Sequence, residues 1–331
     1  MAPRKIAELS SQKVIYAAIA GNLLVATTKI SAAIWTGSSA MLSEAVHSVV
    51  DSGNSILLLY GLHRAKRRPD HDHPLGYGRE IYFWSFVVAV LVFALGAGVS
   101  LYEGIAHVLD PQPVQDEMVV YAVIGASAVF DGATWWISLR SFRKRTRYRD
   151  LFKAVRNSKD PPSFMVLFED SASLIGLFIA LLGTYLSVHL GLPILDGVAS
   201  ILIGLVLATT AALIARETKG LLIGEAADPT IVDSIMRLAK DMEGVAHANG
   251  VITIHLAPQQ IVVALSLEFA DELKTPEIEV KVIELERRLR QLHPEVATLF
   301  VKPQSSLGFN VAVLRRFGKE TGNESGAGAI G

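Results

Sequence analysis

The chain has 331 residues, of which 51% are hydrophobic and 19% charged, and its formal net charge is −1. Soluble globular proteins have more charged residues, so this composition predicts a membrane protein provided that the apolar residues cluster into runs. The near-zero net charge offers no argument for nucleic-acid binding. Because the chain has no cysteine, disulfides and thiolate ligands are excluded, and any metal must be held by nitrogen and oxygen donors.

The apolar residues do cluster. A short basic lead-in, MAPRKIAELSSQK, precedes an apolar stretch that is too long for a signal peptide and lacks its cleavage pattern. Six apolar segments of about 20 residues or more follow, and each is long enough to cross a hydrocarbon core of about 30 Å. They lie at residues 14–36, 39–62, 80–108, 117–139, 163–187 and 194–215. Residues 1–216 are therefore predicted to form a six-helix transmembrane transport domain.

The charge of the loops predicts the orientation of these spans. The loops HRAKRRPDHDHPLGYGR and RSFRKRTRYRDLFKAVRNSKDPPS are rich in Arg and Lys, whereas TGSSA, DPQPVQDE and VHLGLP contain neither. Basic loops stay on the cytoplasmic side. We therefore expect a multi-pass protein of the cell's inner membrane with both termini in the cytoplasm.

The pattern changes after Glu217. Two amphipathic helices, DPTIVDSIMRLAKDMEGV and TPEIEVKVIELERRLRQLHPEV, alternate with the predicted strands VITIHLAP, QIVVALSLEFA and ATLFVKP. Residues 217–304 are thus expected to form a small cytoplasmic α+β domain. The tail at residues 305–331 ends in a Gly/Ser-rich sequence and is expected to be disordered.

Two polar clusters interrupt the apolar segments. His47 and Asp51 lie four residues apart in the second segment, so on a helix they share one face and can grip one ion. Glu169 and Asp170 interrupt the fifth segment. Ionisable groups are costly in hydrocarbon and mark ion or proton routes, although a lone His can simply hydrogen-bond across a helix interface. Counted along the helices, Asp51 and Asp170 lie at about 12 and 10 Å from the cytoplasmic face, which predicts one shared metal site.

Other polar residues are expected near the same layer. Asp131 and Asn22 fall at similar depths, and either ligation or interhelical hydrogen bonding would explain them. Glu44 shares the helical face of His47, one turn nearer the outside. We expect it to act as an exit-side carboxylate or as a hydrogen-bond partner of the ligands. Lys29 is expected to neutralise an acidic neighbour or to snorkel rather than to bind substrate.

These motifs resemble the cation diffusion facilitator family. The resemblance rests on SSAMLSEAVHSVVDSGN, HDHPLGYGRE and ALGAGVSLYEGIAHVLDPQPV, and it extends over nearly the whole chain. The segments RPDHDHPLGYG, LDPQPV, FDGATWW and KDPPSFMVLFEDSASLIG are most similar to the zinc transporter 9 branch. The resemblance implies six spans, a cytoplasmic ferredoxin-like domain, and a homodimeric antiporter that exchanges cytosolic divalent metal, zinc first of all, for protons.

The resemblance also implies a ligand set. Carried over by position, the tetrahedral transport site uses His47, Asp51 and Asp170. Val166 stands where a fourth ligand is usual, so Glu169, which we favour, or Asp131 or a water completes the shell. The metal is cargo, and no further cofactor is expected.

Two further metal sites of the family are incomplete here. In the loop after the second span, Asp70, Asp72 and His73 fit a weaker cytoplasmic site, but Tyr77 replaces a second histidine; a solvated polar loop is the alternative. In the soluble domain, the last strand lacks the ligands that would complement His247 and His255. We expect this domain to dimerise mainly through packing.

Three alternatives to zinc export stay open. The first is an exporter of the same fold that carries iron(II), manganese or cobalt, which the change at Val166 leaves open. A second is a membrane metal sensor that does not transport. A third is a membrane metalloenzyme, which the absence of HExxH, GxSxG or a comparable motif disfavours; we therefore expect that the protein is not an enzyme.

Overall fold

The structure is a computed structural model that describes residues 22–145 and 150–317. The chain divides into two units, residues 1–219 and 220–331. Each unit has its own hydrophobic core, so we describe them separately.

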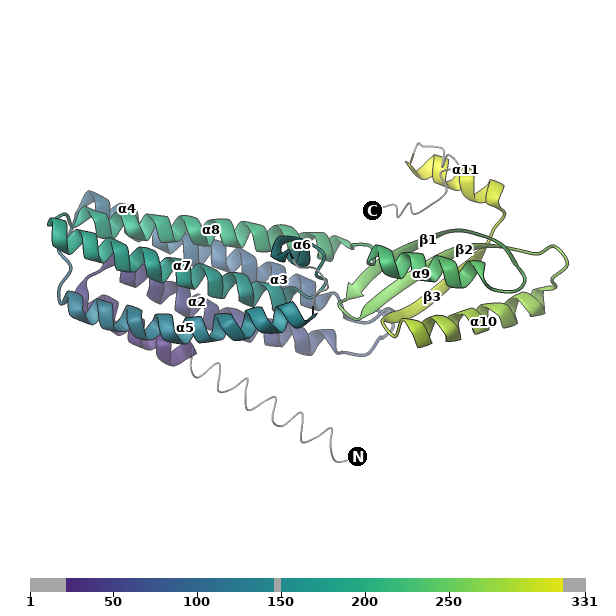
Figure 1. Ribbon diagram of the computed structural model, residues 1–331, viewed down its shortest axis with the longest axis horizontal. Helices are drawn as coiled ribbons and strands as arrows, with labels where there is room; N and C mark the ends of the chain where they lie inside the picture. Colours follow the sequence, from purple (N-terminus) through teal and green to yellow (C-terminus); the bar gives the residue numbers. More distant parts are fainter. Residues whose placement is uncertain (1–21, 146–149, 318–331) are drawn as a thin grey trace, which may run out of the picture. The chain divides into compact units, whose positions relative to one another are not determined.

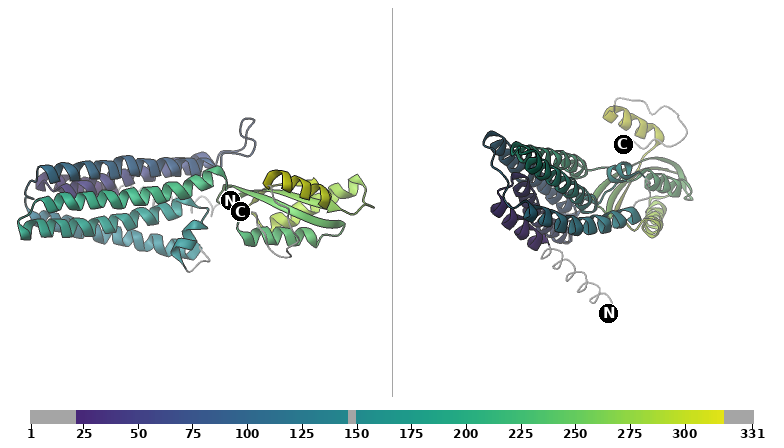
Figure 2. Two further views of the ribbon diagram at one scale, coloured as in Figure 1. Left: turned by 90° about the horizontal axis from the view of Figure 1, so that it is seen from above. Right: turned by 60° about the vertical axis from the view of Figure 1, so that its left-hand side comes forward.

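The first unit consists of long helices that run side by side in all the views (Figures 1 and 2). Residues 22–36 form the described part of the first helix. The later helices are α2 (Ser39–Ala65), α3 (Glu80–Leu91), the π-helical segment η1 (Val92–Ala97), α4 (Gly98–Leu109), α5 (Glu117–Arg145), the short α6 (Leu151–Arg156), α7 (Pro161–Leu190) and α8 (Ile194–Ile223). The segments α3, η1 and α4 follow one another without a break.

Within the described ranges, four helices are long and apolar enough to cross a membrane. They are Glu80–Leu109, Glu117–Lys144, Pro161–Leu190 and Ile194–Ile223. Helix α2 has sufficient length but contains Glu44, His47 and Asp51, which lower its hydropathy. The helix before it is described only from residue 22. The spans expected at 14–36 and 39–62 therefore stay predictions.

A buried carboxylate fixes the beginning of α2. Asp196, near the beginning of α8, accepts hydrogen bonds from the Ser38 hydroxyl (2.8 Å) and the Ala40 backbone N–H (3.1 Å). It also accepts one from the Thr184 hydroxyl of α7 (3.1 Å). Because the first N–H groups of a helix lack partners within the helix, this carboxylate stabilises the α2 N-terminus and ties it to α7 and α8. The same contacts fix the position of His47, about two turns further along α2.

Small residues let the helices of the first unit approach closely. Gly104 of α4 lies against Gly197 and Ile201 of α8, so closely that an added Cβ would lie 2.7 Å from the Ile201 backbone nitrogen. Gly183 of α7 packs in the same way against Ala199 of α8. Close backbone approach of this kind is the main source of helix association where water is absent.

The second unit is a three-stranded sheet with helices. Its elements are α9 (Pro229–Lys240), β1 (Val245–Ala257), β2 (Gln260–Phe269), α10 (Thr275–Leu292), β3 (Val296–Pro303) and α11 (Ser306–Phe317). The strand order is β1-β2-β3, with β1 antiparallel and β3 parallel to β2. Alternate residues of β2, including Ile261 and Leu265, share one core with α9 and α10, which therefore cover the same face. The α+β character expected from the sequence is present.

The segment that we expected to be disordered begins with a helix. Helix α11 occupies Ser306–Phe317, and its Phe309 ring packs on Gly250 of β1, where a Cβ would collide with it. The Ser306 hydroxyl donates to the Asn249 side chain (2.9 Å), so the beginning of α11 is also tied to β1. Disorder is therefore wrong for these residues, and residues 318–331 lie outside the described part of the chain.

The contact at Gly104 predicts a specific sensitivity. Gly104→Ala forces a Cβ into the α8 backbone and should destabilise the first unit by about 1–3 kcal/mol. Thermal unfolding of the purified protein in detergent measures this. Gly125→Ala on α5 is the matched control, because nothing lies within 4 Å of its added Cβ. Equal unfolding temperatures for both variants would contradict the packing described here.

Candidate metal site

The site centres on His47 and Asp51 of α2. The His47 side chain is 1% exposed, and its Nε2 lies 3.5 Å from Asp51 Oδ2. Neither ring nitrogen has a hydrogen-bond partner of good geometry among the described residues, although the ring lies beside the Glu169 backbone. Asp51 Oδ1 is likewise buried without a partner in that part of the chain. Buried polar atoms are nearly always satisfied, so this imidazole–carboxylate pair fits half of a metal site.

Glu169 faces α2 from α7. It is 7% exposed, and its Oε1 accepts a hydrogen bond from the Asn54 side chain (3.0 Å). Asn54 is three residues beyond Asp51, and therefore on the same side of α2. Sequence reasoning missed Asn54, although its i,i+3 spacing from Asp51 would have indicated it. The Asn54 amide holds the Glu169 carboxylate toward the helix that bears His47 and Asp51.

Asp170 points instead toward α5. Its Oδ2 accepts a hydrogen bond from the Ser138 hydroxyl (3.0 Å). Asp51 lies near enough to interact electrostatically with both Glu169 and Asp170. No group of three or more His, Asp or Glu side chains in the described residues is close enough to hold a metal. The four predicted ligands thus lie in one region without forming a closed shell.

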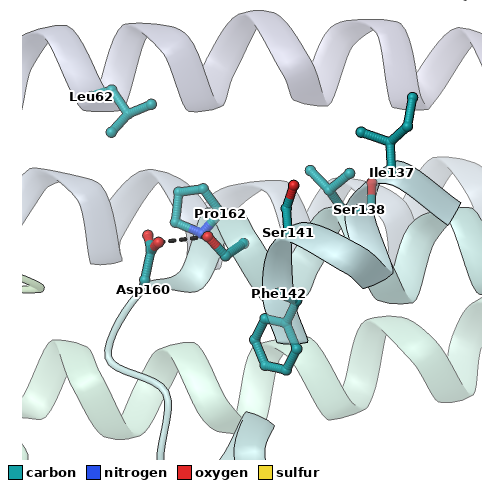
Figure 3. A pocket seen from close by; sticks show the side chains of 9 residues that line it. Leu62, Ile137, Ser138, Ser141, Phe142, Asp160 and Pro162 are labelled. Atoms are coloured by element: carbon teal, nitrogen blue, oxygen red, sulfur yellow. Dashed lines mark hydrogen bonds between the residues drawn. The ribbon is translucent and has the colours of Figure 1, made fainter. Parts of the chain in front are cut away.

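A pocket of about 360 Å³ lies beside this region, between α2, α5 and α7. Figure 3 shows Ser138 and Ser141 of α5, with Asp160 and Pro162 at the beginning of α7, on its wall. Val166, which replaces the expected fourth ligand, also lines the pocket. Ser138 therefore links the pocket to Asp170, and Val166 gives the pocket an apolar wall in place of a ligand.

Two of the remaining candidates, Glu44 and Asp131, pair with Lys29. The Lys29 ammonium is 3.1 Å from Glu44 Oε2 and 3.6 Å from Asp131 Oδ2. Asp131 Oδ2 also accepts a hydrogen bond from the Ser173 hydroxyl (2.7 Å). The expectation that Lys29 neutralises an acidic neighbour is confirmed. Asn22 is half-buried, seven residues and therefore about 10 Å along the helix from Lys29.

In the loop after α2, both carboxylate oxygens of Asp70 accept hydrogen bonds from the protein. Its Oδ2 accepts a hydrogen bond from the Tyr77 hydroxyl (2.5 Å), and its Oδ1 accepts one from the His73 backbone N–H (2.8 Å). These bonds, the Tyr77 one foremost, lower the pKa of Asp70. The His73 ring lies against the Tyr77 ring, with centroids 4.3 Å apart and planes tilted by 33°, whereas Asp72 is exposed. Tyr77, at the position where the resemblance implies a second histidine, thus holds Asp70 in a hydrogen bond.

The two histidines of β1 do not form a pair within the chain. His247 and His255 are eight residues apart on one extended strand, which separates them by about 27 Å. His255 is buried, with Nδ1 3.3 Å from the Ala257 carbonyl oxygen, whereas His247 is exposed. Burial explains His255 without a metal.

The buried ionisable groups of the first unit indicate the kind of protein this is. Long apolar helices that bury an imidazole and several carboxylates in their interior are typical of membrane proteins that move ions. The chain belongs to the cation efflux family, because the family's cation efflux transmembrane domain matches residues 15–223.

Several curated relatives align with most of this chain. The mitochondrial proton-coupled zinc antiporter SLC30A9 of Xenopus laevis is 35% identical over 233 residues, which are 70% of this chain and 41% of that protein. Its Homo sapiens counterpart is 32% identical over 231 residues, 69% and 41% of the two chains. Metal tolerance protein C4 of Arabidopsis thaliana is 31% identical over 240 residues, 72% and 52%. The chain thus spans about half or less of these relatives.

The loop contact predicts a shift in titration. Tyr77→Phe removes the hydroxyl that lowers the pKa of Asp70, so this carboxyl should protonate at a higher pH than in the parent protein. Carboxyl ¹³C NMR of the aspartate-labelled full chain in micelles measures the titration. Tyr60→Phe, on α2, is the control and should leave the Asp70 curve unchanged. An unchanged curve in Tyr77→Phe would contradict the assigned bond.

Proposed function

We propose that the protein exports a divalent metal, zinc, from the cytosol in exchange for protons. The observation that supports this most is the buried His47–Asp51 pair, which has unsatisfied donor atoms and faces Glu169 across α2 and α7. The SLC30A9 relatives are named as proton-coupled zinc antiporters, which supports both the ion and the coupling.

The exchange follows from the chemistry of these groups. A metal requires a neutral imidazole and ionised carboxylates, and protons compete for the same lone pairs. Histidine is the residue that ordinarily exchanges protons near neutral pH, so His47 is the natural exchanging group. Metal enters from the cytosol, the helices rock, and protons from the other side release it. The pocket beside Ser138 is the proposed entrance, because it adjoins the basic loop that precedes α7.

In this proposal the metal shell consists of His47, Asp51, Asp170 and Glu169. Asn54 orients Glu169, as partners of ligating carboxylates commonly do, and Ser138 does the same for Asp170. Binding requires the side chains of α2 and α7 to draw together around the ion. An imidazole among carboxylates favours zinc over manganese.

The arrangement in the membrane is part of the proposal. It has six spans, including residues 14–36 and 39–62, with both termini in the cytoplasm and the protein in the cell's inner membrane. The two basic loops support this orientation. The second unit, of ferredoxin-like type, lies in the cytoplasm and joins two copies of the chain into a homodimer.

The ligand assignment predicts the behaviour of His47→Ala. Purified protein in liposomes with an imposed pH gradient should take up zinc, and the variant should be slower by more than about tenfold because the shell loses its nitrogen donor. His189→Ala is the control, since His189 is exposed and stacks on Tyr185. Normal flux in His47→Ala would remove the ligand assignment, and zinc flux that ignores the gradient would remove the proton exchange.

A second prediction concerns the fourth ligand. Zinc affinity should fall by more than about 10-fold in Glu169→Gln, and likewise in Asp170→Asn, because each removes a ligating carboxylate and even the loss of a ligand's partner costs about that much. Asp131→Asn should lower it less than either, since Asp131 pairs with Lys29 and acts on Asp51 and Asp170 only through its charge. Isothermal titration in detergent measures these values. A larger loss in Asp131→Asn than in Glu169→Gln would assign the fourth position to Asp131. Zinc bound without net flux would instead favour the metal sensor.

A further inference from the structure

One buried ion cluster of the first unit does not belong to the proposed metal shell. It consists of Lys29, Glu44 and Asp131, contributed by the first described helix, α2 and α5 respectively. Lys29 and Glu44 are fully buried, and the Asp131 side chain is 15% exposed. We refer to these three residues as the lysine cluster.

The charges of the lysine cluster do not balance. One ammonium faces two carboxyl groups, and Glu44 Oε1 is buried without a hydrogen-bond partner among the described residues. That oxygen lies directly against Gly176 of α7, where any Cβ would collide with it. A buried carboxylate oxygen is costly without a donor or a cation. The Lys29 ammonium thus satisfies Glu44 Oε2 but leaves Glu44 Oε1 without a partner among the described residues.

The atoms of the lysine cluster that could bind a metal are all oxygens. At the position of the Lys29 ammonium, a small cation would meet Glu44 Oε2 and Asp131 Oδ2, and Asp131 Oδ2 is itself held by the Ser173 hydroxyl. Carboxylate and hydroxyl oxygens suit hard divalent ions such as Mn²⁺ more than zinc. The site with an imidazole, at His47, has a different preference.

We propose that Lys29 is a built-in cation that occupies a divalent-metal site formed by Glu44 and Asp131 and so keeps these carboxylates from retaining metal. Lys29 does not bind the metal; it acts through Glu44 and Asp131, whose ability to retain a divalent ion it removes. The role in transport rests on the proposed function: Glu44 lies one turn of α2 from His47, so a metal leaving that site toward the α2 N-terminus passes the cluster. With Lys29 in place, that metal finds Glu44 Oε2 and Asp131 Oδ2 already paired with an ammonium.

The test removes the ammonium and counts bound metal. Mn²⁺ binding to the full chain in detergent is measured by electron paramagnetic resonance, for the parent protein, Lys29→Gln and Lys29→Arg. Lys29→Gln should bind one more Mn²⁺ per chain than the parent, because two buried carboxylates then lack their cation. Lys29→Arg keeps the charge and should bind the parent number. The triple variant K29Q/E44Q/D131N should also return to the parent number.

Each outcome decides the proposal. A folded Lys29→Gln variant that binds no extra Mn²⁺ overturns it, as does an extra ion that persists in the triple variant. If Lys29→Gln can be purified only with Mn²⁺ present, the ion has replaced the ammonium and the proposal stands; failure to fold even with Mn²⁺ contradicts it. Because this measurement counts bound ions, it is independent of zinc flux, so an extra Mn²⁺ ion without any flux in the parent protein would refute the antiport alone.

Discussion

The cost of burying ionisable groups away from water is the constraint on which the first unit depends. A charged side chain in such a place costs several kcal/mol unless a partner compensates it. Glu44 has the ammonium of Lys29, Glu169 has the amide of Asn54, and Asp196 has two hydroxyls and a backbone N–H. Among the described residues, both His47 ring nitrogens and Asp51 Oδ1 are buried without a hydrogen-bond partner of good geometry, and the two side chains lie 3.5 Å apart. A cation bound between them would relieve part of that cost.

The two ends of α2 are held by different partners. At its beginning, Asp196 joins α2 to α7 and α8. Near its other end, Arg64 pairs with Glu80 of α3 (2.9 Å), and Leu62 borders the pocket that reaches Ser138. A transporter that alternates its access needs one end that opens while the other stays closed. In the proposed exchange, the end that opens is the one at the pocket, and the Asp196 end stays closed.

Much of this arrangement could be predicted from the sequence, for physical reasons. The i,i+4 spacing fixes His47 and Asp51 on one face of a helix, and a lysine in an apolar segment must find a carboxylate. The α+β unit was predictable because its apolar residues alternate with the period of strands and then of helices. The family match at residues 15–223 agrees with the resemblance carried by those motifs.

Other features could not be predicted in this way. Asn54 and Ser138 are ordinary polar residues, and a depth count along a helix is uncertain by several ångströms, so their pairing with Glu169 and Asp170 depends on how the helices pack. Helix α11 was missed because the Gly/Ser-rich composition of the chain end concealed a short apolar repeat that packs on β1. Local composition does not reveal such tertiary contacts.

Side chains of α2 and α7 are proposed to bind one metal ion through His47. This is measured by zinc K-edge X-ray absorption of the full chain loaded with one equivalent of zinc. We expect four nitrogen and oxygen donors at about 2.0 Å, one of them an imidazole whose scattering disappears in His47→Ala. A shell without imidazole, or one that is unchanged in His47→Ala, would contradict it.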